Sequence, residues 1–232
     1  MKQEKTDRDE KEKLLAYLNR FITEHKLKKF DEVIRNRTRY LTVVLEDIFQ
    51  PHNASAVLRT CDVFGIQEVH IIENRNRYEV NPDVALGSSK WLTLLKYHGE
   101  ENNTVTCLDR LKSQGYAIIA TSPHKDDYTP ENLPLDKKIA LIFGTELEGL
   151  SPAALGKADG FVRIPMVGFT ESLNISVSAA LLIAALSGRL RQSGIDWHLT
   201  AEEELDIRLG WARHTIRKSD LIEKAYREKR NG

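Results

Sequence analysis

The segment RIPMVGFTESLNISVS, residues 163–178, joins a short β-rich run to a helix that is apolar on nearly every side. The apolar stretch of that helix runs from Ile175 to Leu186. Such a helix must be buried on several sides, either in a deep core or between subunits. Ser172 and Asn174 stand directly before it, and both residue types commonly cap a helix N-terminus. The segment therefore predicts a strand, a loop and a buried helix in succession.

Upstream of this segment, short β-rich runs alternate with helical stretches. Alternation of this kind predicts an α/β fold, a parallel sheet with helices on both faces. Ligands of open parallel sheets bind where loops leave the carboxyl ends of the strands, so these loops are the first place to look for a site. The expected strands are residues 41–45, 69–72, 92–97, 116–121, 139–143 and 161–164.

Both ends of the chain are expected to be helical extensions, 1–36 and 194–232, around a core of 37–193. Apolar residues in 10–27 recur at helical spacing between charged positions, which predicts one amphipathic helix there. At the other end, a link at 193–199 precedes a helical region at 201–230.

The composition is that of an ordinary globular protein. Of 232 residues, 41% are hydrophobic, and the longest apolar stretch, 179–186, is far below the roughly 18 residues that a membrane span requires. We therefore expect a cytoplasmic protein without a membrane partner. Cys61 and Cys107 have unrelated spacing and no neighbouring His cluster, which excludes a zinc motif and predicts two small buried side chains.

Charge is balanced overall, with 34 basic and 34 acidic residues, but it is unevenly distributed. A single basic run is most simply a solvated helix face, whereas basic clusters at both ends also leave room for contacts with RNA phosphates. The basic residues concerned are Lys26, Lys28, Lys29, Arg35, Arg37 and Arg39 near the start, with Arg213, Arg217, Lys218, Arg227, Lys229 and Arg230 near the end.

The first loop of interest, QPHNASAVLRT at 50–60, follows the first expected strand. Asn53 is predicted to cap a helix that runs to about Phe64. Arg59 lies two residues beyond Val57, and at about 100° per residue it points roughly 200° away from the core face. Arg59 is therefore either an ordinary exposed arginine or a guanidinium held toward a loop cluster or a partner chain.

The second loop, IFGTELEGLS at 142–151, ends at Ser151, which predicts a helix N-cap with Pro152 at the first helical position. Its glycines let the backbone approach a ligand closely. The loop lacks the Gly-Lys-Ser/Thr ending of a phosphate-binding Walker motif. Glu146 and Glu148 are also compatible with a glycosidase acid and base, but two carboxylates on one loop specify little.

Taken in order, the three segments resemble the three motifs of the SpoU or TrmH family, RNA ribose 2′-O-methyltransferases of the SPOUT class. The resemblance covers roughly 37–191, and the first motif, Pro-His-Asn-x-Ser-Ala-x-x-Arg-Thr, is most similar to the branch that methylates guanosine 18 in the tRNA D-loop. It implies transfer of a methyl group from S-adenosylmethionine to a ribose 2′-hydroxyl of tRNA, without a metal. It also implies a C-terminal trefoil knot and a homodimer with the active site between subunits.

The same resemblance assigns roles to residues of this chain. Arg59 is implied as the central catalytic residue and Asn53 as its support, and Glu146, Ser172 and Asn174 complete the catalytic set. The implied donor-binding residues are Thr121, Gly144, Ile164, Met166 and Leu173, and the candidates for RNA contacts are His52, Arg37 and Arg39.

Two alternatives remain open at the level of sequence. The first is the same reaction on ribosomal RNA or at another tRNA position, because the motifs identify the chemistry better than the substrate. The second is a protein of the knotted fold that binds RNA or S-adenosylmethionine without catalysis.

Overall fold

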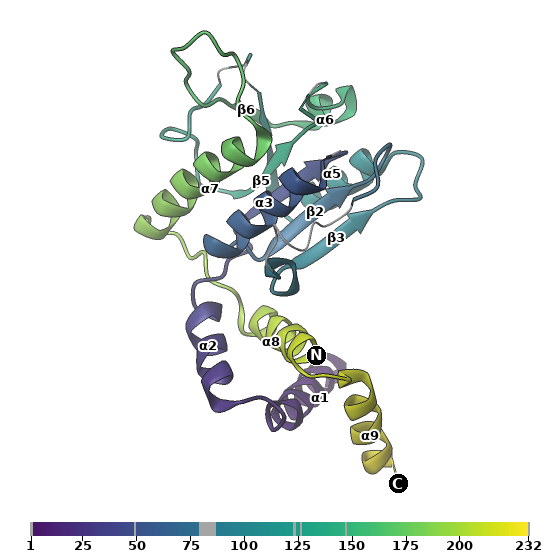
Figure 1. Cartoon of the computed structure of the whole chain (residues 1–232). Coiled ribbons are helices and arrows are strands. Elements are labelled where there is room, and N and C mark those ends of the chain that lie inside the picture. The colour runs from purple at the N-terminus through teal and green to yellow at the C-terminus, as the bar shows by residue number, and fades with distance from the viewer. Residues whose placement is uncertain are drawn as a thin grey trace. The chain divides into compact units, whose positions relative to one another are not determined.

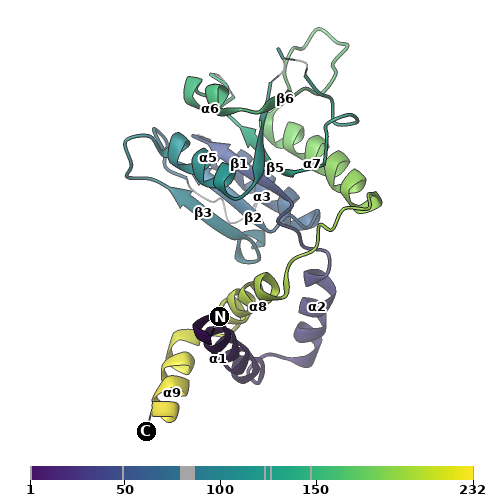
Figure 2. The same ribbon diagram turned by 180° about the vertical axis from the view of Figure 1, so that it is seen from behind.

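The structure is a computed structural model that describes residues 2–48, 50–78, 87–122, 124–125, 127–146 and 148–231. The chain forms two compact units (Figure 1; Figure 2 shows the reverse side). One unit comprises Thr38–Trp197. The other is formed by the two ends of the chain together, up to Arg37 and from His198 onward.

The larger unit is built on a six-stranded parallel sheet in the order β3-β2-β1-β5-β4-β6. Each expected strand is present, which confirms the parallel α/β prediction; β6 ends two residues earlier than expected. The strands are β1 Leu41–Glu46, β2 Glu68–Ile72, β3 Thr93–Tyr97, β4 Tyr116–Thr121, β5 Lys138–Phe143 and β6 Gly160–Val162.

Helices cover both faces of this sheet. On one face, α3 (Pro51–Val63) and α7 (Ile175–Gln192) pack against each other and against the larger apolar core (Figure 1). On the other face, α5 (Asn103–Ser113) and α6 (Pro152–Lys157) cover a second core. A short 3₁₀ helix, η1 (Ser88–Lys90), precedes β3. Because β1 is buried on both faces, all six of its residues are inaccessible.

The strand order reverses at the centre of the sheet. The chain passes from β1 to β2 on one side, whereas β5 pairs with the other side of β1, with Val43 opposite Val69 and Leu141. The loops after β1 and β5 therefore diverge at this switch point, where open α/β sheets commonly bind ligands.

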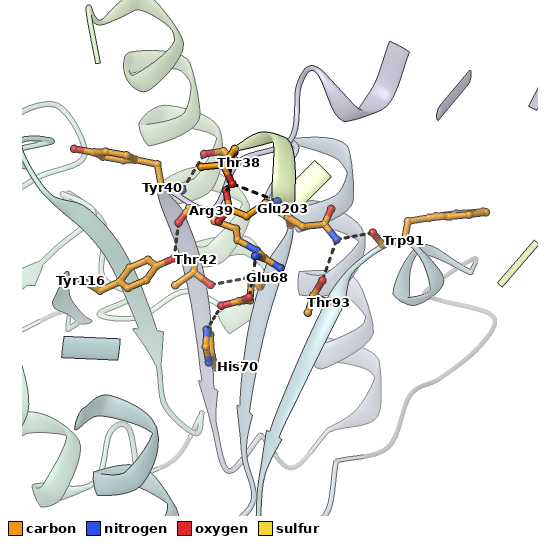
Figure 3. A network of polar contacts seen from close by, with 12 residues as sticks. Thr38, Arg39, Tyr40, Thr42, Glu68, His70, Trp91, Thr93, Tyr116 and Glu203 are labelled. Carbon is orange, nitrogen blue, oxygen red and sulfur yellow. Dashed lines mark hydrogen bonds and ion pairs between the residues drawn. The ribbon is translucent and has the colours of Figure 1, made fainter. Parts of the chain in front are cut away.

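A buried polar network connects side chains of β1, β2 and β3 (Figure 3). The Glu68 carboxylate is 3.0 Å from Nε2 of His70 and forms a 3.4 Å ion pair with Arg39, and Nδ1 of His70 is 2.9 Å from the Tyr97 hydroxyl. The Thr42 hydroxyl donates to the Glu68 carbonyl at 2.7 Å. Burial alone would raise the pKa of Glu68, but the hydrogen bond and charge of His70, with the charge of Arg39, lower that pKa below its ordinary value.

The terminal unit contains α1 (Lys2–Asn19), α2 (Glu24–Ile34), α8 (Ala201–Thr215) and α9 (Ser219–Asn231). The prediction of one helix over 10–27 is wrong. The Thr23 hydroxyl accepts the Lys26 N–H and starts a new helix, so two helices share that stretch.

The predicted helical region at 201–230 is likewise divided. Lys218 adopts a left-handed backbone conformation (φ 62°) between α8 and α9, which a continuous helix excludes. At the start of α8, Thr200 and Glu203 form a reciprocal capping box. The acidic run at 202–204 thus lies in the first turn of a helix, where negative charge is stabilised.

Candidate active site

The loops that follow β4, β5 and β6 meet around one cavity of about 470 Å³ at the carboxyl edge of the sheet. The structure brings together all five residues that the sequence assigned to the donor, as well as Glu146 and Ser172 from the catalytic set. They lie in the wall of the cavity as follows: Thr121 after β4, Gly144 and Glu146 after β5, and Ile164, Met166, Ser172 and Leu173 between β6 and α7.

The cavity wall is divided between apolar and polar side chains. Buried apolar residues from the strands and from α7 form its inner part, including Phe143, Val162 and Leu182. Ser122 and His124 also line it, and the sequence interpretation did not name them. Their position directly after β4, at the edge where ligands bind, was the signal that could have identified them.

The loop after β5 requires a glycine at 144. Thr145 and Gly149 exchange backbone hydrogen bonds of 2.9 and 3.1 Å, which fold the loop back on itself. A Cβ atom on Gly144 would lie 2.3 Å from the backbone carbon and oxygen of Gly149 and 2.5 Å from the Leu150 nitrogen. Since all of these atoms belong to the backbone, a side chain at 144 would displace the wall of the cavity.

Beside the cavity, three side chains from separate segments form a hydrogen-bonded cluster. Nδ2 of Asn53, on α3, donates to Oε1 of Glu146. Nδ2 of Asn174 donates to Oδ1 of Asn53 at 3.2 Å and to Oε1 of Glu146 at 3.4 Å. Oδ1 of Asn174 accepts the Ser176 N–H at 2.8 Å, so Asn174 is the N-cap of α7, as predicted.

The prediction that Asn53 caps α3 is wrong. Gln50 is the N-cap residue, without a side-chain cap, and the helix begins at Pro51, whose fixed φ suits the first helical position. Asn53 lies inside the first turn and is buried. Its amide is consequently available to Glu146 and to Gln50, whose Oε1 accepts from Nδ2 at 3.2 Å.

Arg59 is placed differently from the rest of the catalytic set. It is exposed on α3, while Val57 and Cys61 of the same helix are buried, as the angular argument predicted. It does not line the cavity described above. In the part of the chain that the structure describes, no hydrogen bond or ion pair engages its guanidinium. Within one chain, therefore, the structure does not bring Arg59 to the other site residues.

The three candidates for RNA contacts differ in exposure. His52 is exposed in the first turn of α3, at the carboxyl edge of the sheet. Arg37 is only 2% exposed, with its guanidinium 5.6 Å from the centre of the Trp211 ring. Arg39 precedes β1, at the opposite edge, and pairs with Glu68. These placements favour a structural role for both arginines.

Not every side of α7 is covered within the chain. Ala179, Ile183 and Leu186 are buried in the larger core, but Val177 and Leu181, one turn apart, remain about half exposed. In the loop before α7, Val167 and Phe169 are fully exposed. The helix therefore has an apolar face that this chain alone does not bury.

Neither cysteine offers a reactive thiol. Cys61 and Cys107 are free and buried, as predicted, and burial raises the pKa of Cys107 to about 12. Among the described residues, no cluster of three or more His, Cys, Asp or Glu side chains could hold a metal ion. No helix in that part of the chain is long and apolar enough to cross a membrane.

Residues 40–184, which include all three loop segments, match the model of the SpoU rRNA Methylase family. The chain belongs to this family. The SpoU methylase core thus extends from β1 into α7 and includes the cavity and the Asn53–Glu146–Asn174 cluster.

Individual SpoU relatives extend the likeness to most of the chain. A tRNA (guanosine(18)-2′-O)-methyltransferase of Borreliella burgdorferi is 47% identical over 211 residues, 91% of this chain and 95% of that protein. The structure of an A. aeolicus TrmH/SpoU tRNA modifying enzyme superposes with a TM-score of 0.74 at 30% identity, covering 84% of this chain and 98% of the other.

A more distant relative shares only the fold. The SpoU methyltransferase AviRb from Streptomyces viridochromogenes, solved in complex with the cofactor AdoMet, superposes with a TM-score of 0.59 at 20% identity. The two chains overlap over 70% of this one and 65% of AviRb.

Proposed function

We propose that this protein transfers the methyl group of S-adenosylmethionine to the ribose 2′-hydroxyl of guanosine 18 in tRNA. The observation that supports this most is that the second and third motif loops line one cavity, and that the Asn53–Glu146–Asn174 cluster ties the first motif to them. The names of its relatives from B. burgdorferi and A. aeolicus support tRNA as the substrate. Such a substrate places the protein in the cytoplasm.

The cavity fits the donor in chemistry as well as in size. Its inner wall is apolar, as the faces of an adenine ring require, and cofactor pockets commonly have volumes of about 300–1,000 Å³. In this proposal the backbone near Ile164, Met166 and Leu173 holds the adenine, with Thr121 and Gly144 lining the rest of the donor. The bound donor supplies an electrophilic methyl carbon on a sulfonium, so the protein mainly has to align it with the acceptor oxygen.

Arg59 acts on the acceptor side. A guanidinium holds its proton strongly, so it is a poor general base. It binds instead a phosphate and the 2′-oxygen of the RNA, while a nearby acceptor or the phosphate takes the hydroxyl proton. Glu146, held by Asn53 and Asn174, lies in the cavity wall, and Ser172 completes the donor side.

The active protein is a homodimer, and Arg59 serves the cavity of its partner. Two observations support this: Arg59 lies outside the cavity of its own chain, and α7 has an unburied apolar face at Val177 and Leu181. A second copy related by twofold symmetry would cover that face. We also propose that the last third of the larger unit is threaded as a trefoil knot. His52 is proposed to contact the tRNA.

A subunit-mixing experiment tests this arrangement. We expect Arg59→Ala and Glu146→Gln each to be inactive alone and the co-expressed mixture to recover activity. Half of randomly assorted dimers are mixed and one of their two sites is intact, so recovery approaches about a quarter of the native rate. If the mixture stays inactive although mixed dimers are isolated, Arg59 acts within its own chain.

The choice of substrate is tested separately, with tRNA and ribosomal RNA transcripts and labelled donor. Label incorporated into tRNA supports the proposed substrate. Label incorporated into ribosomal RNA alone contradicts tRNA as the substrate but does not contradict ribose 2′-O-methylation as the reaction.

A further inference from the structure

A second cavity, of about 640 Å³, adjoins the first. The two share the wall formed by the loop after β5, at Thr145, Glu146 and Glu148–Leu150. Its other residues come from the ends of β1 and β2 and the starts of α3 and α6: Glu46, Asp47, Gln50, Arg75, Asn76, Ser151 and Pro152. Resting on the proposed function, we propose that this cavity binds the base of the acceptor nucleotide, a guanine whose ring N1–H donates to Oδ2 of Asp47.

Asp47 is the residue that points to a ligand. It is only 8% exposed and adopts a left-handed backbone conformation (φ 52°), an uncommon one for a residue other than glycine. Its Oδ1 accepts the backbone N–H groups of Asn74, Arg75 and Asn76 at 2.7, 2.8 and 3.3 Å. Its Oδ2 accepts no hydrogen bond from the described residues. Asp47 lines the cavity, and its Oδ2 is not among the fully buried atoms of the described residues that lack a partner, so this oxygen is open to accept an N–H from a ligand there.

The neighbouring carboxylate shows the contrast. Glu46 is buried as well, but Oε1 accepts the Thr104 and Ser151 hydroxyls at 2.6 and 2.7 Å, and Oε2 accepts the Ser151 N–H at 2.9 Å. Glu46 therefore fixes the wall, because it joins the end of β1 to the start of α6 and to α5. Asp47 fixes the loop after β2 through Oδ1 and leaves Oδ2 free for the cavity.

The charges of the cavity exclude a phosphate as its occupant. Four acidic residues and one basic residue are among its described lining residues, so negative charge predominates; they are Glu46, Asp47, Glu146 and Glu148, with Arg75. A nucleobase edge carries no charge, and guanine presents a ring N–H where adenine presents an unprotonated nitrogen. A carboxylate oxygen attracts the ring N–H of guanine and repels the unprotonated ring nitrogen of adenine, which gives the site a preference for guanine.

The entrance can open at little cost. Nη1 of Arg75 is 2.6 Å from Oε2 of Glu148, and the two side chains are 72% and 69% exposed. Exposed pairs of this kind contribute little to stability. A base can therefore displace the pair and lie beside the donor cavity, with its ribose toward the shared wall.

The variant Asp47→Asn tests the assignment at a single atom. Asparagine has the same shape, tolerates the left-handed conformation and keeps an oxygen for the three backbone N–H groups. It replaces Oδ2 by an N–H donor, which repels N1–H of guanine and suits N1 of adenine. The matched control is Glu101→Gln, a change of the same charge on an exposed residue outside both cavities.

The measurements are kcat/KM on tRNA transcripts with guanosine or adenosine at the target position, and the Kd of S-adenosylmethionine. In Asp47→Asn we expect kcat/KM for guanosine to fall about tenfold or more, the guanosine-to-adenosine ratio to fall with it, and the donor Kd to stay at the native value. Glu101→Gln should match the native protein in all three.

Several outcomes would overturn the inference. An unchanged guanosine-to-adenosine ratio of kcat/KM in Asp47→Asn does so. If that ratio is unchanged and the Kd of S-adenosylmethionine rises, Asp47 binds the ammonium group of the donor instead. If Asp47→Asn does not fold, the native protein is tested on tRNA that carries N1-methylguanosine at the target position. Methylation of this tRNA at the rate seen with guanosine overturns the inference, and loss of methylation supports it. Native protein that transfers nothing to the guanosine transcript refutes the proposed function itself.

Discussion

Nδ2 of Asn174, at the start of α7, donates a 3.2 Å hydrogen bond to Oδ1 of Asn53, in the first turn of α3, although 121 positions separate the two residues. Both amides also donate to Oε1 of Glu146 on the loop after β5. Three motif segments are thereby tied together beside one cavity. This link makes the geometry of the site depend on both helix N-termini.

Substituting Asn174 should affect activity more than stability. Asn174→Ala removes the cap of α7, which costs about 1 kcal/mol of unfolding free energy. It also releases Asn53 and Glu146, so methyl transfer should fall at least about tenfold. Asn102→Ala is the matched control, because Asn102 caps α5 through the Val105 N–H, outside both cavities. Chemical denaturation and transfer assays on both variants check this; equal activities would separate the cluster from catalysis.

Gly144→Ala should abolish donor binding with a modest change in the rest of the fold. The added methyl group would collide with the backbone of Gly149 and Leu150 and displace the cavity wall. Gly156→Ala, on α6, is the control, because apart from its chain neighbours and the backbone of its own helix no described atom lies within 4 Å of its Cβ position. Calorimetric titration with S-adenosylmethionine measures the difference. Native affinity in Gly144→Ala would place the donor elsewhere.

Arg59→Lys tests whether the planar guanidinium is required. Arg59 is exposed and makes no hydrogen bond or ion pair with the described residues, so the free energy of unfolding should change by less than about 0.5 kcal/mol. Transfer should nevertheless be lost, because an ammonium cannot bind phosphate and 2′-oxygen as a fork. Arg110→Lys, on the exposed side of α5, should keep full activity. Near-native rates and an unchanged pH–rate profile in Arg59→Lys would contradict this role.

Stability should fall in acid in a way that depends on Glu68. The pKa of Glu68 is lowered in the folded state from an ordinary value of 4.5. Its ionised form therefore stabilises the fold above that value, and the contribution is lost as the pH falls through the folded pKa. Glu68→Gln should be less stable at neutral pH and show a flatter acid dependence. Urea denaturation from pH 7 down to acid measures both; parallel curves for the two proteins would rule out this contribution.

Much of the fold could be predicted from the sequence because parallel strands buried on both faces are continuous apolar runs. β5 is the clearest example, because its residues from Ile139 to Phe143 are all apolar and buried, whereas β3 at the edge of the sheet is only partly buried. The helix breaks were missed for a local reason. Thr23 and Lys218 interrupt amphipathic patterns that continue on either side. Periodicity alone therefore predicts one continuous helix at each of these positions.

The candidate site was predictable residue by residue only through the motifs. The capping chemistry of Asn174 follows from its position before an apolar helix, but nothing local indicates that Asn53 faces Glu146 rather than the helix end. The free oxygen of Asp47 could not be foreseen either. It depends on the loop at 74–76 folding back onto the end of β1, a contact between segments that no periodicity encodes.

The most direct test of the central claim is a nucleotide-resolved map of methyl transfer. Native protein and Arg59→Ala are incubated with labelled S-adenosylmethionine and unmodified tRNA, and the modified nucleotide is located by nuclease digestion. We predict label on the 2′-oxygen of guanosine 18 with the native protein and none with Arg59→Ala. Equal labelling by the two proteins, or label on a base instead of a ribose, would contradict the account.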